Sequence, residues 1–264
     1  MTDPYNQIKK LDANAASYGK VMTDSQLASG GYELALATVG KMLEGYVSHG
    51  LLPASNAAIA YNGSSFYLKG TWNPPSDYYN KRTSSWVSIV DGVVQRKRIT
   101  EDGDNLPMPN KVIIGITSAG NLKIYGGAGN IWGMAGSPAS RQKYYDELIA
   151  DKTKNTWTFG PVLIRDGKAV SLEKPKESAY RQIICQINSN NYAMLTSSHP
   201  MSYETAINKL LGIGCKAAYN LDGGGSTSIF YKKAGSNKAT KIGCFDGANR
   251  TTCRSMVDGI YFTE

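Results

Sequence analysis

Asn220-Leu221-Asp222-Gly223-Gly224-Gly225-Ser226-Thr227 is the stretch around which the chain is organised. It follows Lys216-Ala217-Ala218-Tyr219, which predicts a short buried strand. A carboxylate therefore stands at a strand end, and three glycines and two hydroxyl side chains come directly after it. Glycine tolerates positive φ and has no Cβ, so such a turn lets backbone N–H groups approach a ligand closely. The stretch predicts either a cradle for an anionic substrate or a tight turn between two strands.

Short strand patterns dominate the chain from Ala57 onward. Asp91-Gly92 and Ser118-Ala119-Gly120-Asn121 each separate two apolar runs, which predicts two hairpins. A helix that Ser202 can cap leads directly into the strand that delivers Asp222. The pattern predicts an α+β fold, with a mixed or antiparallel β-sheet core and a few packed helices.

Residues 1–54 differ from the rest of the chain. Residues 1–30 are polar with weak helical spacing, whereas apolar residues between Tyr32 and Val47 recur at steps of three and four, which predicts an amphipathic helix. We expect an N-terminal helical extension over residues 1–54 and a main domain over residues 55–264. The extension either packs on the main domain, the commoner outcome, or attaches it to a partner.

The amino-acid composition limits the classes of molecule that the protein is expected to bind. The net charge of +8 and the pI near 9.1 suit an anionic partner such as nucleic acid, a phosphorylated glycan or a cell wall. The basic residues are scattered, and no nucleic-acid module is recognisable. No run approaches the ~18 apolar residues of a membrane span. The polar N-terminus lacks the pattern of a signal peptide, so we expect a cytoplasmic protein or one carried in a virus particle.

The four cysteines form no CxxC pair, which together with a count of two histidines argues against a zinc site. Cys244 and Cys253 bracket a short loop and either form a disulfide or stay reduced. Cys185 and Cys215 lie in apolar surroundings, where we expect them to be plain core residues.

Residues 218–227 resemble the signature of the phosphodiester glycosidase family, and further segments match that family in the same order. The weaker matches are Tyr61-Asn62-Gly63-Ser64-Ser65-Phe66, Phe159-Gly160-Pro161-Val162-Leu163-Ile164-Arg165-Asp166-Gly167-Lys168, Arg181, and Arg254-Ser255-Met256-Val257. The resemblance covers roughly residues 55 to 264. It implies an enzyme that cleaves a sugar from a sugar-1-phosphodiester in a glycan, a cell-wall polymer or a nucleotide-linked sugar.

Such a reaction needs a proton-handling group and groups that hold the phosphate. With only His49 and His199 available, a carboxylate is the expected proton handler. Asp222 is the first candidate and Asp246 the second. Arg181 and Arg254 match family arginines, and a guanidinium can bind two phosphate oxygens at once. The predicted catalytic residues are Asp222, Arg181 and Asp246. The predicted substrate-binding residues are Asn62, Gly63, Gly160, Asn220, Gly223, Gly224, Gly225, Ser226, Thr227 and Arg254.

One departure from the family keeps a second hypothesis open. Family members carry an Asp-Gly-Arg element before the helix that leads to the Gly-rich strand, and here the region reads Thr196-Ser197-Ser198-His199-Pro200. The alternative is a non-catalytic protein that binds a glycan or sugar phosphate, as a component of a virus particle. The sequence shows no array of metal ligands, although Asp222 and an anionic substrate together could hold Ca²⁺ or Mg²⁺.

Overall fold

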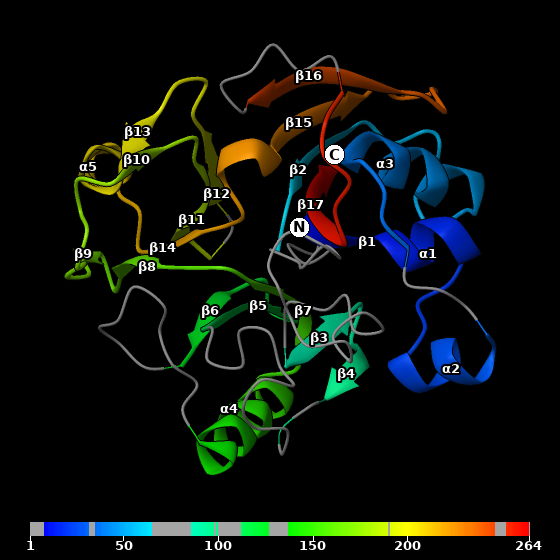
Figure 1. Cartoon of the computed structure of the whole chain (residues 1–264), viewed down its shortest axis with the longest axis horizontal. Helices are drawn as coiled ribbons and strands as arrows, with labels where there is room; N and C mark the ends of the chain where they lie inside the picture. The colour runs from blue at the N-terminus through cyan, green and yellow to red at the C-terminus, as the bar shows by residue number, and fades with distance from the viewer. Residues whose placement is uncertain are drawn as a thin grey trace, which may run out of the picture.

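The computed structural model describes residues 8–31, 35–64, 86–97, 99, 112–126, 137–189, 191–245 and 252–263. Within these residues every strand pairing is antiparallel, and helices are few (Figure 1). The α+β prediction is therefore confirmed. Among the described helices, none has the length and apolar character needed to cross a bilayer.

Two five-stranded sheets form the body of the molecule. Sheet I contains, in spatial order, β1 (Ile8–Asp12), β17 (Asp258–Thr263), β2 (Ala58–Asn62), β15 (Thr227–Lys232) and β16 (Ala239–Phe245). Sheet II contains, in spatial order, β12 (Asn191–Thr196), β11 (Gln182–Asn188), β14 (Ala217–Asn220), β8 (Val162–Arg165) and β9 (Lys168–Ala169). The two sheets stand side by side in Figure 1, and the Gly-rich stretch connects them.

Three smaller sheets complete the fold. Sheet III contains, in spatial order, β6 (Leu122–Tyr125), β5 (Ile113–Thr117) and β7 (Thr153–Thr158). The two-stranded sheets pair β3 (Val87–Val90) with β4 (Val93–Lys97) and β10 (Ser178–Ala179) with β13 (Met201–Ser202). The hairpins predicted around residues 91–92 and 118–121 are confirmed as β3–β4 and β5–β6.

Helices cover the outer faces of both large sheets (Figure 1). The helices are α1 (Ala13–Tyr18), α2 (Asp24–Ser29), α3 (Val39–Ser48), α4 (Pro138–Ala150), α5 (Tyr203–Gly212) and the short 3-10 helix η4 (Gly224–Ser226). On α5, the Ser202 hydroxyl accepts from the Thr205 N–H at 3.1 Å, so the predicted cap is confirmed. The predicted amphipathic helix is α3, which buries Met42 and Leu43 against sheet I.

The N-terminal segment joins the main body directly. β1 pairs with β17, with Ile8 opposite Phe262, so residues expected to be weakly helical form a strand instead. That pairing joins two ends of the chain, and local spacing gives no sign of it. α1 and α3 share one apolar cluster with Ala60 and Tyr261 of sheet I. The segment therefore packs on the rest of the protein, the first of the two outcomes considered.

The structure pairs all four cysteines. Cys185 is bonded to Cys215 with their Cα atoms 6.0 Å apart, and Cys244 is bonded to Cys253. The expectation that Cys185 and Cys215 are plain core thiols is therefore wrong about their bonding, although both are buried. The α5 segment brings Cys215 back beside β11. The disulfide thus joins two residues 30 positions apart in the sequence, and composition alone does not reveal this pairing.

Candidate active site

The predicted Gly-rich stretch is the link between the two large sheets. β14 is the central strand of sheet II, with β11 on one side and β8 on the other. Asp222 follows β14, the turn of η4 comes next, and Thr227 opens β15 of sheet I. The carboxylate is therefore at a strand end, as predicted, and the glycines carry the chain from one sheet to the other (Figure 1).

Asn62, the last residue of β2, holds both ends of this link. Its side-chain Nδ2 donates to the Asp222 carbonyl oxygen, and its Oδ1 accepts from the Ser228 N–H at 2.9 Å. The Asp222 N–H in turn donates to the Gly63 carbonyl at 2.9 Å. Asn62 is fully buried, so these bonds are shielded from water. The structure thus brings Asn62 and Gly63 to Asp222, three residues that sequence reasoning assigned to one cleft.

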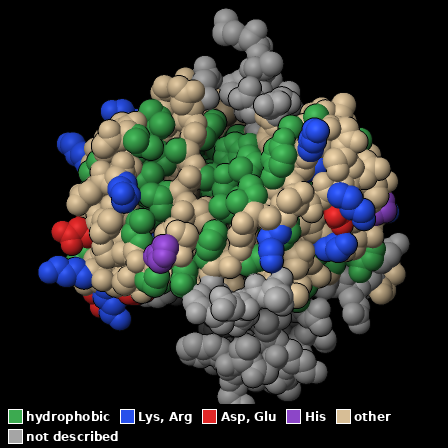
Figure 2. Space-filling model, turned by 90° about the horizontal axis from the view of Figure 1, so that it is seen from above, with side chains coloured by type: hydrophobic (Ala, Val, Ile, Leu, Met, Phe, Trp, Pro, Cys, Tyr) green, Lys and Arg blue, Asp and Glu red, His purple; other side chains and the backbone are tan. Residues whose placement is uncertain are grey.

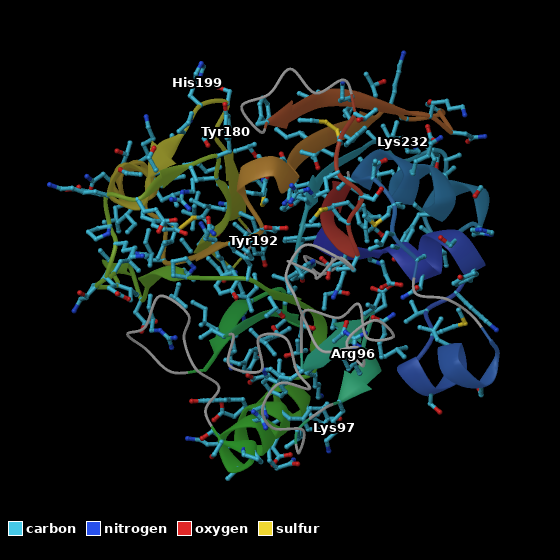
Figure 3. The ribbon with its side chains drawn as sticks, viewed as in Figure 1. Arg96, Lys97, Tyr180, Tyr192, His199 and Lys232 are labelled. Atoms are coloured by element: carbon cyan, nitrogen blue, oxygen red, sulfur yellow. A yellow bond between two sulfur atoms is a disulfide. The ribbon has the colours of Figure 1, made fainter. Side chains whose placement is uncertain are left out.

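Gly223 lies against the chain of sheet II. A Cβ added there would lie 2.5 Å from the Tyr180 carbonyl oxygen. That same carbonyl accepts from the Gly224 N–H at 2.8 Å, and Gly224 has φ +55°. Figure 3 shows Tyr180 beside the turn. Two of the three glycines are therefore explained by backbone contact and backbone conformation.

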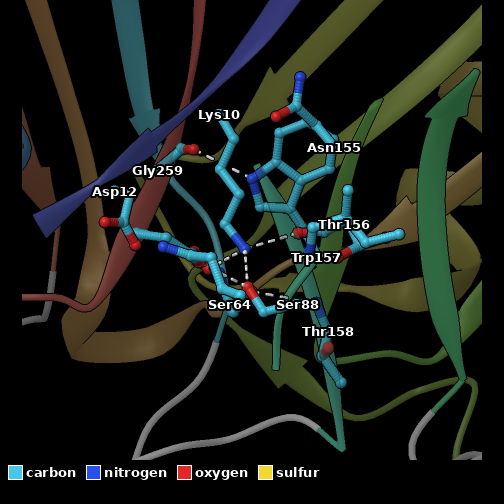
Figure 4. A network of polar contacts seen from close by, with 12 residues as sticks. Lys10, Asp12, Ser64, Ser88, Asn155, Thr156, Trp157, Thr158 and Gly259 are labelled. Carbon is cyan, nitrogen blue, oxygen red and sulfur yellow. Dashed lines mark hydrogen bonds and ion pairs between the residues drawn. The ribbon is translucent and has the colours of Figure 1, made fainter. Parts of the chain in front are cut away.

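A buried ion pair supports the other side of the Asn62-Gly63 corner (Figure 4). Asp258 accepts from the Ser64 N–H at 2.6 Å and pairs with Lys10 Nζ at 3.0 Å. Lys10 also donates to the Thr156 carbonyl at 2.7 Å. A Cβ on Gly63 would overlap Asp258 Oδ1, so the corner has no room for a side chain. Sequence reasoning missed Lys10 and Asp258; the available signal was an acid placed two residues before the apolar run Ile260-Tyr261-Phe262.

Gly160 and Asn220 hold each other beside the strand end. The Gly160 N–H donates to the Asn220 carbonyl at 2.9 Å, and Asn220 Nδ2 donates to the Gly160 carbonyl at 2.9 Å. The Gly160-Pro161 peptide bond is cis. These contacts place the predicted Gly160-Pro161 segment next to the Gly-rich link.

Arg254 reaches the link, with its Nη1 donating to Ser226 Oγ at 3.2 Å. Ser226 is buried, whereas Arg254 is exposed overall. Arg254 follows Cys253 directly, and the Cys244–Cys253 disulfide ties this segment to β16 of sheet I. The structure therefore brings one of the two predicted arginines to the turn.

The guanidinium of Arg181 has other neighbours. It donates to the Met201 carbonyl at 3.1 Å and to the Glu177 carbonyl at 2.6 Å. It also stacks on the Tyr203 ring, with Cζ 3.6 Å from the ring centroid, and the residue is 4% exposed. The Arg181 backbone lies next to Gly223, but its guanidinium contacts residues at the start of α5. A role of Arg181 as phosphate clamp therefore stays a prediction.

Several buried polar atoms around the link have no hydrogen-bond partner among the described residues. These atoms are Gln182 Oε1, Asn220 Oδ1, Thr227 Oγ1 and Ser228 Oγ. Buried polar groups in folded proteins are normally paired, and leaving one unpaired costs about 1–3 kcal/mol. All four can accept a hydrogen bond, so this region has acceptors to offer a ligand or bound water. Sequence reasoning missed Gln182 and Ser228 because their neighbours depend on the fold.

The remaining candidates contribute less. Asp246 lies outside the described residues. His199 is exposed at the edge of the molecule, where its Nδ1 lies 3.0 Å from Ser198 Oγ (Figure 3). Within the described ranges, no group of three or more His, Cys, Asp or Glu side chains could hold a metal ion.

Comparison with known proteins identifies the class. The sequence model of the phosphodiester glycosidase family matches residues 55–263, which is most of the chain. That match places the chain among proteins of glycosidase type. The chain belongs to the phosphodiester glycosidase family. No sequence among the curated proteins matches it.

Two solved structures share the fold. The catalytic domain of zebrafish N-acetylglucosamine-1-phosphodiester α-N-acetylglucosaminidase, auto-inhibited by its pro-peptide, aligns with a TM-score of 0.53 at 13% identity. That alignment covers 99% of this chain and 74% of the zebrafish chain. A Burkholderia pseudomallei protein described as exported aligns with a TM-score of 0.51 at 10% identity, covering 98% of this chain and 72% of that one. At these identities the likeness establishes the fold alone.

Proposed function

We propose that this chain hydrolyses the bond between a sugar and the phosphate of a glycosyl phosphodiester. The observation that carries the proposal is the arrangement at the link between the sheets. Asn62 fixes the backbone of Asp222, and Arg254 donates to Ser226 four residues further along. We assign the roles of acid and phosphate-binding cation to these two residues, Asp222 and Arg254, on either side of a turn made of glycines.

The phosphate would lie against the turn, near Arg254 and Ser226. Arg254 is exposed and held by a hydroxyl, so its other guanidinium donors can reach an anion. A phosphate would also benefit from the net charge of +8, which raises the local concentration of anionic substrates. The sugar would then extend towards Asp222.

In the reaction, a water oxygen bonds to the anomeric carbon while the bond from that carbon to the bridging phosphate oxygen breaks. The Asp222 carboxylate takes a proton from the water and stabilises the positive charge that develops on the sugar ring. The bridging oxygen and its electron pair leave with the phosphate monoester. A phosphate monoester is a weak base, so its departure does not require a separate general acid.

The family's fold and sequence match support a glycosidase-type activity, and the zebrafish enzyme acts on a sugar phosphodiester by its name. Asp222→Asn tests the assignment, because it keeps the shape of the side chain and removes the charge. The measurement is the release of free sugar from a panel of sugar-1-phosphodiesters, with and without a chelator. Hydrolysis by Asp222→Asn at the parent rate would contradict the role of Asp222.

A second candidate is a protein that binds a sugar phosphate without turnover, as a component of a virus particle. The absence of the family's Asp-Gly-Arg element favours it, since Ser197 stands there and its Oγ accepts from the Arg181 N–H at 2.7 Å. Calorimetry separates the two candidates. Tight binding of an intact sugar phosphodiester, with no product formed over hours, would support the binding protein.

A further inference from the structure

An apolar face of sheet I leads away from the proposed site. Side chains alternate along a strand, so Thr227, Ile229 and Tyr231 of β15 share one face, opposite to the face of Phe230 that packs on α3. On β2, Tyr61 lies opposite Ile229 in the register. Ile59 lies opposite both Tyr231 and Phe262, so two apolar rows follow Thr227 towards the edge of the molecule.

Sheet II supplies a facing wall. Met194 of β12 pairs with Ile184 of β11, so both side chains lie on the same face of this sheet. Tyr192 and Met194 pack against the cluster that contains Ile184 and Ile260, and Ile260 belongs to sheet I. In the view of Figure 3, Tyr192 lies between the two sheets. The two walls therefore meet at their base and enclose a trench.

At the outer end the trench is formed by sheet I alone. A cavity of about 170 Å³ is lined there by Ala57, Ala58, Ile59, Tyr231, Phe262 and Thr263, which lie in sheet I or directly before it. Seen from above, hydrophobic side chains gather in a hollow near the centre of this surface (Figure 2). Tyr231, at the mouth, is 39% exposed, which is high for a large apolar side chain in a paired strand.

The inner end of the trench is polar. Thr227 Oγ1 from sheet I and Gln182 Oε1 from sheet II are both buried without a hydrogen-bond partner among the described residues. Gln182 lies opposite Thr196 on β12, on the same face as Met194. Tyr231 is four positions after Thr227, which at about 3.3 Å per residue gives a trench roughly 13 Å long. The walls are thus apolar along their length and polar where they reach the Gly-rich link.

We propose that this trench holds an alkyl or isoprenoid chain joined to the phosphate, so that the substrate is a lipid-linked sugar phosphodiester. This inference rests on the proposed function, because it places the phosphate at the Gly-rich link. A ligand that fits this trench must be aliphatic along its length and polar at the end that reaches the Gly-rich link. A saccharide chain fits less well. Tyrosine side chains on the walls can contact a sugar ring, but the other sugar hydroxyls would face Ile59, Ile229 and Met194, which offer no hydrogen bonds.

Binding of simple alkyl phosphates tests the trench without requiring catalysis. Burying two methylene groups fully should tighten binding about tenfold. Decyl phosphate should therefore bind at least tenfold more tightly than butyl phosphate, as measured by calorimetry. Tyr231→Asp should remove this difference and leave butyl phosphate affinity unchanged. Ile213→Asp is the matched control, since Ile213 is 51% exposed at the end of α5 and outside the trench. If Tyr231→Asp fails to fold, Ile59→Asn serves as the second variant.

The outcomes separate the trench from the proposed function. Equal affinity for the two alkyl phosphates, or competition by a neutral oligosaccharide for the decyl phosphate site, would overturn the trench assignment. A chain-length preference that Tyr231→Asp abolishes would support it, even if no sugar is released from a decyl phosphodiester, and the proposed hydrolysis would then be the part that fails. Hydrolysis with the same kcat/KM for methyl and decyl phosphodiesters would keep the activity and reject the lipid chain.

Discussion

Asn62 and Asp222 are 160 positions apart in the sequence, yet the Asn62 side chain donates directly to the Asp222 carbonyl oxygen. The same side chain accepts from the Ser228 N–H, so one buried amide spans the Gly-rich link. This bond joins the end of β2 in sheet I to the end of β14 in sheet II. The position of the proposed catalytic acid therefore depends on a residue in the other sheet.

Replacing Asn62 with Ala should destabilise the protein and reduce its activity together. The change leaves the Ser228 N–H and the Asp222 carbonyl buried without their partner, which costs about 1–3 kcal/mol of the free energy of unfolding. The measurements are urea unfolding and sugar release. Asn191→Ala is the control, because Asn191 is exposed on the edge strand β12. An Asn62→Ala protein with parent stability would show that this amide does not support the link.

Gly223→Ala should destabilise the protein more than a surface glycine change does. Its new Cβ would meet the Tyr180 carbonyl at 2.5 Å, so the turn or the β11 entry has to move. Gly212→Ala is the matched control, since a Cβ added there would meet no other side chain or segment within 4 Å. Gly212 also lies in the last turn of α5, where Ala is favoured over Gly by about 1 kcal/mol. We expect a lower Tm for Gly223→Ala and an unchanged or higher Tm for Gly212→Ala. The reverse order would contradict the close approach at the turn.

The two arginines should respond differently to replacement by Lys, which keeps the charge but loses the planar fork. Arg254→Lys should raise KM about tenfold with no change in Tm, because Arg254 is exposed and a hydrogen bond to a charged group contributes about 1.5–3 kcal/mol. Arg181→Lys should instead lower the Tm, since its bonds to Met201 and Glu177 and its stacking on Tyr203 are lost. Thermal melts and Michaelis–Menten kinetics on both variants check this. A KM effect for Arg181→Lys with no change in Tm would instead support Arg181 as a phosphate clamp.

Local patterns predicted the elements that carry the site. The glycines after Tyr219, the capped helix ending near residue 212 and the strand between them are all short-range signals, and the structure confirms them. These signals identify each segment as a helix, a strand or a turn. They also placed Asp222 at a strand end before any partner was known.

Long-range contacts supplied what the sequence did not predict. The Lys10–Asp258 ion pair and the Cys185–Cys215 disulfide join residues brought together only by the sheets. The trench depends on the register between β2 and β15, which one sequence does not specify. A lysine within Ile8-Lys9-Lys10-Leu11 resembles surface charge until its strand is placed beside β17.

Asp12 should make stability depend on pH in a way that Asp12→Asn removes. Burial raises the pKa of Asp12 above its usual value, and this effect outweighs the hydrogen bond from the Ala15 N–H and the attraction of Lys10. The folded protein therefore binds this proton more tightly than the unfolded chain does. In the parent protein, Asp12 therefore lowers the free energy of unfolding as the pH rises from about 4, the pH at which the carboxyl of the unfolded chain ionises. This decrease ends once the Asp12 carboxyl of the folded protein has ionised as well. Asn keeps an oxygen for the α1 cap, so the stability advantage of Asp12→Asn should grow across that window and then level off. Urea unfolding at a series of pH values measures it, and a difference that stays constant with pH would mean that the Asp12 carboxyl titrates alike in both states.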